Sequence, residues 1–140
     1  MTTKQLKYKQ VALPEDYLPC ESEPYMNEFQ VEFFRNKLQH DREILQEELD
    51  NLNSEIHSSA NVDSELLDKV SHEIILFSSI KRLSSIQNSI NEIDDSLEIM
   101  ERRKYGFCKK TGKPIGVKRL MATPEAKFCV ETQELFEEQI

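Results

Sequence analysis

Residues 25–105 read YMNEFQVEFFRNKLQHDREILQEELDNLNSEIHSSANVDSELLDKVSHEIILFSSIKRLSSIQNSINEIDDSLEIMERRKY. This stretch holds none of the chain's three glycines or five prolines, the residues that interrupt regular structure most strongly. It is rich in Glu, Lys, Leu, Ile, Gln and Asn, which favours helix. Because it is too long for one ordinary helix, we expect two antiparallel helices that join at the polar segment 57–64.

Apolar residues in both halves recur every three to four positions, the spacing of helices that pack along a seam. We expect the first helix to begin after Asn27 as N-cap, and the second to begin at Asp63 or Ser64. The second helix should end at Tyr105-Gly106, because glycine commonly terminates helices. The predicted seam residues are Phe34, Leu38, Leu45, Leu49, Leu52 and Ile56 in the first helix, and Leu83, Ile86, Ile90, Ile93, Leu97 and Met100 in the second, where Leu66, Val70, Phe77 and Ile80 precede them.

Composition narrows the function classes. The net charge is -8, which argues against a general nucleic-acid binder. No apolar run approaches the roughly 18 residues of a membrane span, and the N-terminus lacks the apolar core of a signal peptide. Three cysteines make no disulfide framework, so a reducing cytoplasmic location is expected. No glycine-rich phosphate loop, nucleophile elbow or full metal-ligand cluster indicates an enzyme.

Two half-motifs lie outside the helical stretch, Cys108-x-x-Thr111 and Cys129-x-x-Thr132. Their spacing is that of a four-cysteine zinc site in which each knuckle has lost one thiolate. A neutral threonine hydroxyl is a poor zinc ligand, and we therefore expect the base to fold without zinc. A disulfide between Cys108 and Cys129, acting as a redox switch, is the alternative. The residues expected to pack the base are Phe107, Ile115, Val117, Leu120, Phe128 and Phe136.

These observations predict a mainly α fold: a long antiparallel coiled-coil hairpin on a small degenerate zinc-finger-like base with a C-terminal helix. Residues 1–24 carry three prolines without a clear hydrophobic period and are expected to form a loose arm. The hairpin should span residues 25–105, with its tip near 57–70, and the base residues 106–140.

Residues 24–137 resemble the DksA/TraR family of bacterial transcription factors. The resemblance rests on YMNE at 25–28, YGFC at 105–108, PIGVKRL at 114–120, and Pro124 with Cys129. It implies a monomeric factor that binds bacterial RNA polymerase directly and does not bind DNA. In that family the coiled coil enters the secondary channel of the polymerase and modulates initiation, as in the stringent response.

The same resemblance assigns the tip. Counting back without gaps from Cys108, the family's tip pattern falls on Glu65, Asp68 and Val70. Glu65 keeps the charge, Asp68 matches the motif, and Val70 replaces an alanine. Candidates for basic contacts with the polymerase are Arg102, Arg103, Lys118 and Arg119.

The guanosine tetraphosphate ppGpp is a partner of many members of that family. Positions that the family uses at its polymerase-facing ppGpp site align with Ser89, Glu92, Thr123 and Gln133. A tetraphosphate prefers Arg or Lys, so these residues argue against ppGpp synergy while they leave ppGpp binding open.

Two other functions fit a helical hairpin. One is a coiled-coil interaction module unrelated to polymerase, which would not need the Cys-x-x-Thr-Gly base. The other is a Gre-like transcript-cleavage factor, whose tip carboxylates would help to hold a catalytic Mg²⁺. Such a factor carries a second globular domain after its hairpin, and residues 106–140 are too few to form one.

Overall fold

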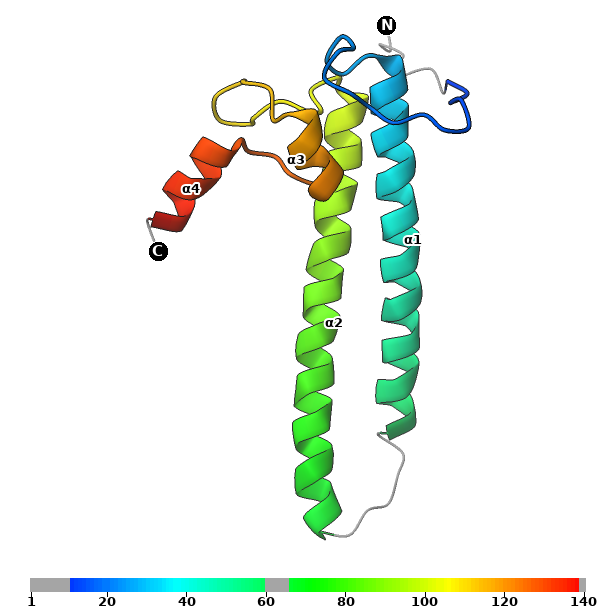
Figure 1. Cartoon of the computed structure of the whole chain (residues 1–140). Helices are drawn as coiled ribbons and strands as arrows, with labels where there is room; N and C mark the ends of the chain where they lie inside the picture. The colour runs from blue at the N-terminus through cyan, green and yellow to red at the C-terminus, as the bar shows by residue number, and fades with distance from the viewer. Residues whose placement is uncertain (1–10, 60–65, 139–140) are drawn as a thin grey trace, which may run out of the picture. The chain divides into compact units, whose positions relative to one another are not determined.

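The computed structural model describes residues 11–59 and 66–138, except that side chains at Ser59 and at 66–70 are not described. The helices are α1 (Glu28–Ser59), α2 (Leu66–Glu101), α3 (Val117–Ala122) and α4 (Val130–Glu138) (Figure 1). In the described residues the only β-type pairing is an isolated bridge between Phe107 and Pro114. The prediction of a mainly α fold is thus confirmed. No described helix is both long and apolar enough to span a membrane.

The start of α1 is fixed by the N-cap that the sequence indicated. The Gln30 backbone N–H donates to Asn27 Oδ1 at 2.9 Å, and the Met26 N–H donates to Gln30 Oε1 at 2.8 Å. This reciprocal arrangement satisfies one backbone N–H of the first turn and one that precedes the N-cap. Glu28 lies in the first turn, where the helix dipole favours a negative charge.

The predicted end of α2 is wrong. The helix ends at Glu101, and Arg103 adopts a left-handed conformation with φ of 60°. The Arg103 N–H bonds to the Met100 carbonyl at 3.0 Å, and the Lys104 N–H bonds to the Ile99 carbonyl at 3.1 Å. This is the hydrogen-bond pattern of a Schellman cap, which is usually built around glycine. Because Arg103 adopts the left-handed conformation here, Gly106 does not mark the end of the helix as the sequence suggested.

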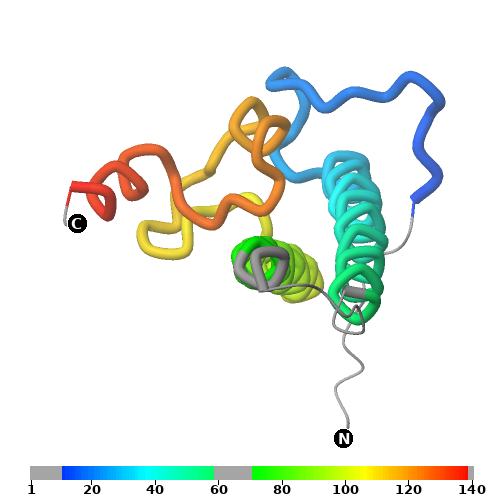
Figure 2. The backbone as a smooth tube through the Cα atoms, turned by 90° about the horizontal axis from the view of Figure 1, so that it is seen from below, coloured from blue at the N-terminus to red at the C-terminus, as the bar shows by residue number. Residues whose placement is uncertain are grey.

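The chain divides into two compact units. We call Asp41–Glu92 the hairpin unit, and Met1–His40 together with Ile93–Ile140 the base unit. In the hairpin unit α1 and α2 lie side by side and antiparallel, as Figures 1 and 2 both show. The seam between them is a buried cluster of Leu49, Leu52, Ile86 and Ile90, against which Leu45, Ile56 and Leu83 pack. This confirms the predicted seam at these seven positions.

The predicted continuation of the seam towards the start of α2 is wrong about which residues are buried. Phe77 and Ile80 are 72% and 50% exposed, whereas Leu76 and Ser79 are half-buried. The apolar run 74–77 offers two possible faces, and pattern alone does not decide between them. Stepping back seven positions from Leu83 gives Leu76, so the helix keeps the heptad phase and leaves Phe77 outside.

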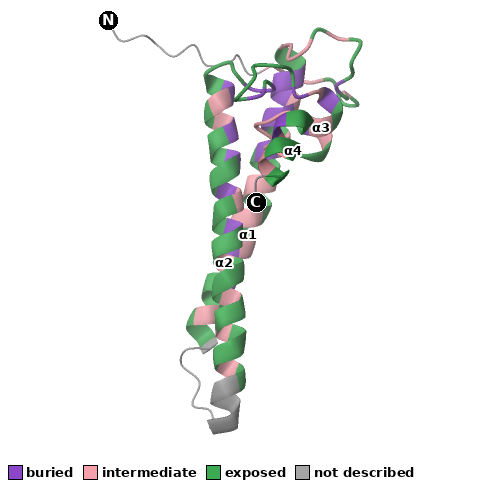
Figure 3. Cartoon of the chain, turned by 90° about the vertical axis from the view of Figure 1, so that its left-hand side faces the viewer, coloured by how far each residue is buried: buried purple, intermediate pink, exposed green. Residues whose placement is uncertain are grey.

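The base unit has the most deeply buried core of the described chain, and buried residues gather there in Figure 3. Phe34, Leu38, Met100 and Leu120 are each 0% exposed, and they come from α1, α2 and α3. Tyr105 donates its hydroxyl to the Pro124 carbonyl at 2.7 Å, which ties the loop after α3 to the end of α2.

Tyr25 joins the start of α1 to the base. Its hydroxyl donates to the Gly106 carbonyl at 2.5 Å and accepts the Gly116 N–H at 3.0 Å. Gly106 has φ of 91°, and a Cβ there would lie 2.7 Å from Met26 Cγ. Only glycine therefore combines this backbone conformation with the close approach of Met26.

Tyr25→Phe should lower the free energy of unfolding by about 1–3 kcal/mol, because the Gly106 carbonyl and the Gly116 N–H lose their partner in a half-buried site. Urea denaturation followed by circular dichroism measures the change. Tyr17→Phe is the control, since the Tyr17 hydroxyl bonds to the Glu23 carboxylate within the arm rather than to backbone groups. Equal costs for the two variants would contradict the role given to Tyr25.

Candidate functional site

The two half-knuckles meet in the base unit, so all four predicted positions form one cluster. Cys108 Sγ and Cys129 Sγ lie 3.5 and 3.1 Å from the same oxygen, Thr132 Oγ1. Thr111 Oγ1 lies 4.0 Å from Cys129 Sγ. Cys108 and Thr132 are buried, Cys129 is half-buried and Thr111 is exposed.

Backbone hydrogen bonds hold the two knuckles together. In the first, the Cys108 N–H bonds to the Lys113 carbonyl at 2.7 Å and the Gly112 N–H bonds to the Cys108 carbonyl at 2.8 Å. The Lys109 N–H bonds to the Lys127 carbonyl at 2.8 Å and so connects this turn to the segment that leads into the second. The knuckle turns are therefore closed by hydrogen bonds within the chain.

The environment of Cys108 favours a thiolate. Burial raises the pKa of this thiol, but hydrogen bonds from the Thr111 and Thr132 hydroxyls and from the backbone N–H groups of Cys129 and Thr111 lower it to about 5. Hydrogen bonds to the charged form of a group stabilise that form. The two threonine hydroxyls thus stabilise the charged form of the Cys108 sulfur.

The donor set of this cluster does not fit zinc. A closed structural zinc site needs four strong ligands, and the cluster offers two thiolates and two neutral hydroxyls. The three histidines lie in α1 and α2 rather than in the knuckles. In the part of the chain that the structure describes, no group of three or more His, Cys, Asp or Glu side chains could hold a metal ion.

The predicted tip residues can be located only in part. Glu65 lies outside the described residues. Asp68 and Val70 belong to α2 by their backbone, and their side chains lie outside what the structure describes. The assignment of these three positions to the tip stays a prediction.

The predicted basic residues separate into two groups. Arg102 and Arg103 line a cavity of about 440 Å³ in the base unit, beside Cys108. Lys118 and Arg119 lie on α3, where Arg119 Nε donates to the Phe128 carbonyl at 3.2 Å. Arg119 is thus partly engaged within the base, while Lys118 is exposed.

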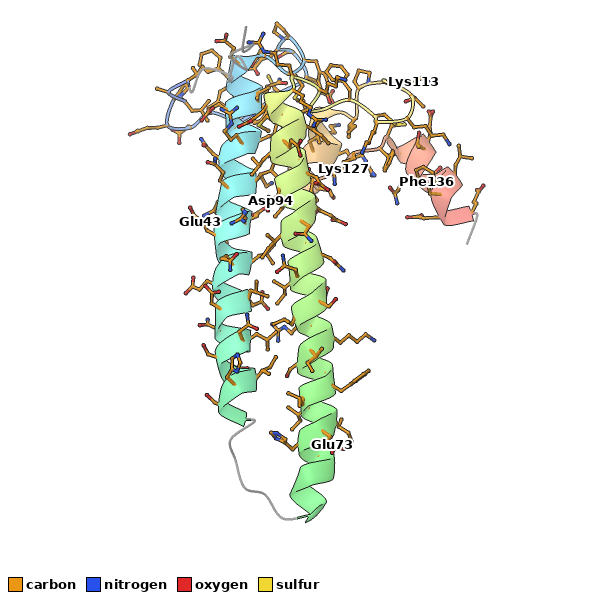
Figure 4. All side chains as sticks on the ribbon, turned by 180° about the vertical axis from the view of Figure 1, so that it is seen from behind. Glu43, Glu73, Asp94, Lys113, Lys127 and Phe136 are labelled. Atoms are coloured by element: carbon orange, nitrogen blue, oxygen red, sulfur yellow. The ribbon has the colours of Figure 1, made fainter. Side chains whose placement is uncertain are left out.

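The cavity brings together five of the basic residues between positions 102 and 127. Its ionisable lining consists of Arg102, Arg103, Lys104, Lys109 and Lys127 besides Tyr105 and Cys108, without a carboxylate. Arg102 bonds to Glu98 at 2.6 Å and Lys127 to Asp95 at 3.5 Å. Figure 4 shows Lys127 beside α2 in the base unit. In the sequence these cations are spread over 26 positions, and only the fold shows that they line the same cavity.

Comparisons with known proteins agree with this geometry. The family described as "Prokaryotic dksA/traR C4-type zinc finger" matches residues 103–138. The RNA polymerase-binding transcription factor DksA of Caulobacter vibrioides is 37% identical over 123 residues, which cover 87% of this chain and 86% of that protein. The protein of the same name from Escherichia coli K12 is 28% identical over 135 residues, which cover 96% and 89%.

A solved structure is also similar. The structure of transcription factor DksA2 from Pseudomonas aeruginosa matches with a TM-score of 0.78 and 32% sequence identity, over 84% of this chain and 93% of that chain. Fold and knuckle cluster together define a helical hairpin protein with a degenerate zinc-finger base. The chain belongs to the DksA/TraR family, as the sequence motifs indicated.

Proposed function

We propose that this protein is a transcription factor that binds bacterial RNA polymerase directly and modulates initiation without being an enzyme. The observation that carries the proposal is the 37% identity, across 87% of the chain, to a protein named for binding RNA polymerase. The net charge of -8 supports action without direct DNA binding, because DNA binding requires cationic surface. We further propose that the protein acts as a monomer in the cytoplasm.

We infer that the hairpin reaches the active centre through the secondary channel. An α-helix with its side chains is about 10–12 Å across, so a two-helix hairpin is slender enough for a narrow channel. The seam of Leu49, Leu52, Ile86 and Ile90 keeps the two helices paired without help from other elements. We propose that Glu65 and Asp68 act at the tip of the hairpin, where their carboxylates would lie close to the catalytic metal ions of the polymerase.

We infer that the response is largely independent of ppGpp. Ser89 and Glu92 lie on α2, Thr123 ends α3 and Gln133 lies on α4, and none of the four side chains carries a positive charge. A tetraphosphate at these positions would lack the charge-assisted hydrogen bonds that Arg or Lys supply.

In vitro transcription with purified polymerase tests the function. Adding the protein should change the yield of full-length transcript, and ppGpp should alter the effect by less than about twofold. Transcription that is unchanged at saturating protein would overturn the proposal. Cleavage of stalled transcripts would instead favour a Gre-like factor, and the absence of polymerase binding would favour a separate interaction module.

We also infer that the base folds without zinc. Its buried residues Ile115, Val117 and Leu120 are at most 8% exposed, and they supply the packing that a metal would otherwise provide. EDTA should shift the melting temperature by less than about 1 °C, since a site with two strong ligands holds zinc weakly. Elemental analysis of protein purified without chelator should find far less than one zinc per chain.

The double variant Thr111→Cys with Thr132→Cys is the matched control, because it restores four thiolates at the spacing of a zinc site. This variant should bind one zinc per chain and should lose stability in EDTA. Stoichiometric zinc in the natural protein, or a melt that collapses in EDTA, would contradict the inference. A melt that responds only to reductant would favour the disulfide.

A further inference from the structure

Cys108 and Cys129 face a common point, although they come from different segments. Cys108 lies in the turn after α2, and Cys129 immediately precedes α4. Both sulfurs are within hydrogen-bond range of Thr132 Oγ1, at 3.5 and 3.1 Å. Both sulfurs thus lie next to one oxygen atom, so the two thiols border a common site.

The surroundings of Cys108 are those of a metal-bound thiolate. Thr132 Oγ1 lies 3.5 Å from its sulfur, and outer hydrogen bonds of this kind orient and tune metal ligands. Cys108 is 3% exposed and Thr132 is 2% exposed, so water reaches the inner side of the cluster poorly. The knuckle turns therefore present preformed sulfur ligands, even though they lack the ligands that zinc requires.

The chemistry of the donor atoms in this cluster indicates which metal ion the cluster can bind. Hard cations such as Mg²⁺ and Ca²⁺ take oxygen ligands, and zinc needs two more strong donors than the cluster has. Soft thiolates suit Cu(I), a closed-shell ion that readily forms two-coordinate, nearly linear complexes. We propose that Cys108 and Cys129 form a two-thiolate Cu(I) site in which the Thr132 hydroxyl donates a hydrogen bond to sulfur.

Charge balance supports this site. When Cu(I) binds, two sulfur–copper bonds form, the protons of any thiols that remain protonated pass to solvent, and no electron is transferred. The resulting centre carries one net negative charge. Cys108 also lines the cationic cavity, whose five Arg and Lys side chains favour an anionic centre beside them. Copper would link the turn after α2 to the start of α4, which stabilises the base.

The experiment uses the full-length reduced protein under anaerobic conditions, titrated against the coloured complex of Cu(I) with bicinchoninate. The protein should withdraw one Cu(I) per chain. Cys108→Ser and Cys129→Ser should each abolish the withdrawal, whereas Cys20→Ser should leave it unchanged. Cys20 is an exposed thiol in the arm whose sulfur lies 3.0 Å from Ser22 Oγ, and it serves as the matched control. Loss of withdrawal in the Cys20 variant, or none with the natural protein, would overturn the proposal.

X-ray absorption at the copper edge keeps the proposal testable if the serine variants fail to fold. The copper complex of the natural protein should show two sulfur neighbours and no nitrogen shell. Copper surrounded mainly by nitrogen or oxygen, or a melting temperature that copper leaves unchanged, would refute the site. Zn²⁺ offered in the same titration should remain with a competing chelator, and tight one-to-one zinc binding would also refute it.

Discussion

Phe34→Ala is expected to lower the free energy of unfolding by about 3–5 kcal/mol, the usual cost of deleting a fully buried aromatic ring. Phe34 is 0% exposed, and its ring centroid lies 5.4 Å from that of Phe33 and 5.8 Å from that of Tyr105. The substitution removes these contacts and leaves a cavity between α1 and the end of α2. The midpoint of urea unfolding should fall while the slope stays constant.

Phe77→Ala is the matched control, because it deletes the same side chain from a helix position that is 72% exposed. Its cost should stay within about 0.5 kcal/mol. A cost at Phe77 equal to that at Phe34 would mean that the seam runs through Phe77 as the sequence pattern suggested, and would contradict the heptad phase of the structure.

Asp68→Asn is expected to abolish the effect on initiation while polymerase binding and the melting temperature stay close to those of the natural protein. Asparagine keeps the size of the side chain and removes its charge, so the variant isolates the electrostatic action that we propose for the tip. The measurement is transcript yield in a purified system at saturating protein, with binding to the polymerase measured in parallel.

Glu73→Gln supplies the control, since it removes one negative charge from an exposed position on α2 (Figure 4). This variant should modulate initiation like the natural protein. If Asp68→Asn also transcribes like the natural protein, the assignment of the tip is wrong. If both variants lose activity, the net charge of the hairpin matters rather than one placed carboxylate.

Features governed by local sequence were predictable. The N-cap at Asn27 follows from a side chain that bonds two or three residues along the chain, and the pairing of Leu49, Leu52, Ile86 and Ile90 follows from spacing alone. The knuckle cluster followed from the interval between Cys108 and Cys129. These predictions needed no knowledge of distant parts of the chain.

Features governed by tertiary contacts were not predictable. Gln30 is 0% exposed because its amide donates to the Cys20 carbonyl at 3.0 Å, and that contact depends on the path of the arm. Ser96 is 1% exposed because the loop after α3 covers it, where its hydroxyl donates to the Glu125 carbonyl at 3.4 Å. A polar residue in a seam gives no signal in sequence that distinguishes such burial from exposure.

The candidate site likewise combines a feature that the sequence predicted with features that only tertiary contacts determine. The spacing in the sequence predicted the cluster of two cysteines and two threonines. The lowered pKa of Cys108, however, depends first on the Thr111 hydroxyl and then on backbone N–H groups, whose directions only the folded turns define. The cationic cavity beside it depends likewise on the end of α2, which Arg103 terminates in a conformation that sequence assigns to glycine.

Binding to core RNA polymerase, with the secondary channel either open or blocked by a covalently tethered plug, tests the central claim most directly. The protein should bind the open enzyme, and the plug should reduce this binding at least tenfold. Equal binding to the open and the blocked enzyme, or no binding to either, would contradict it.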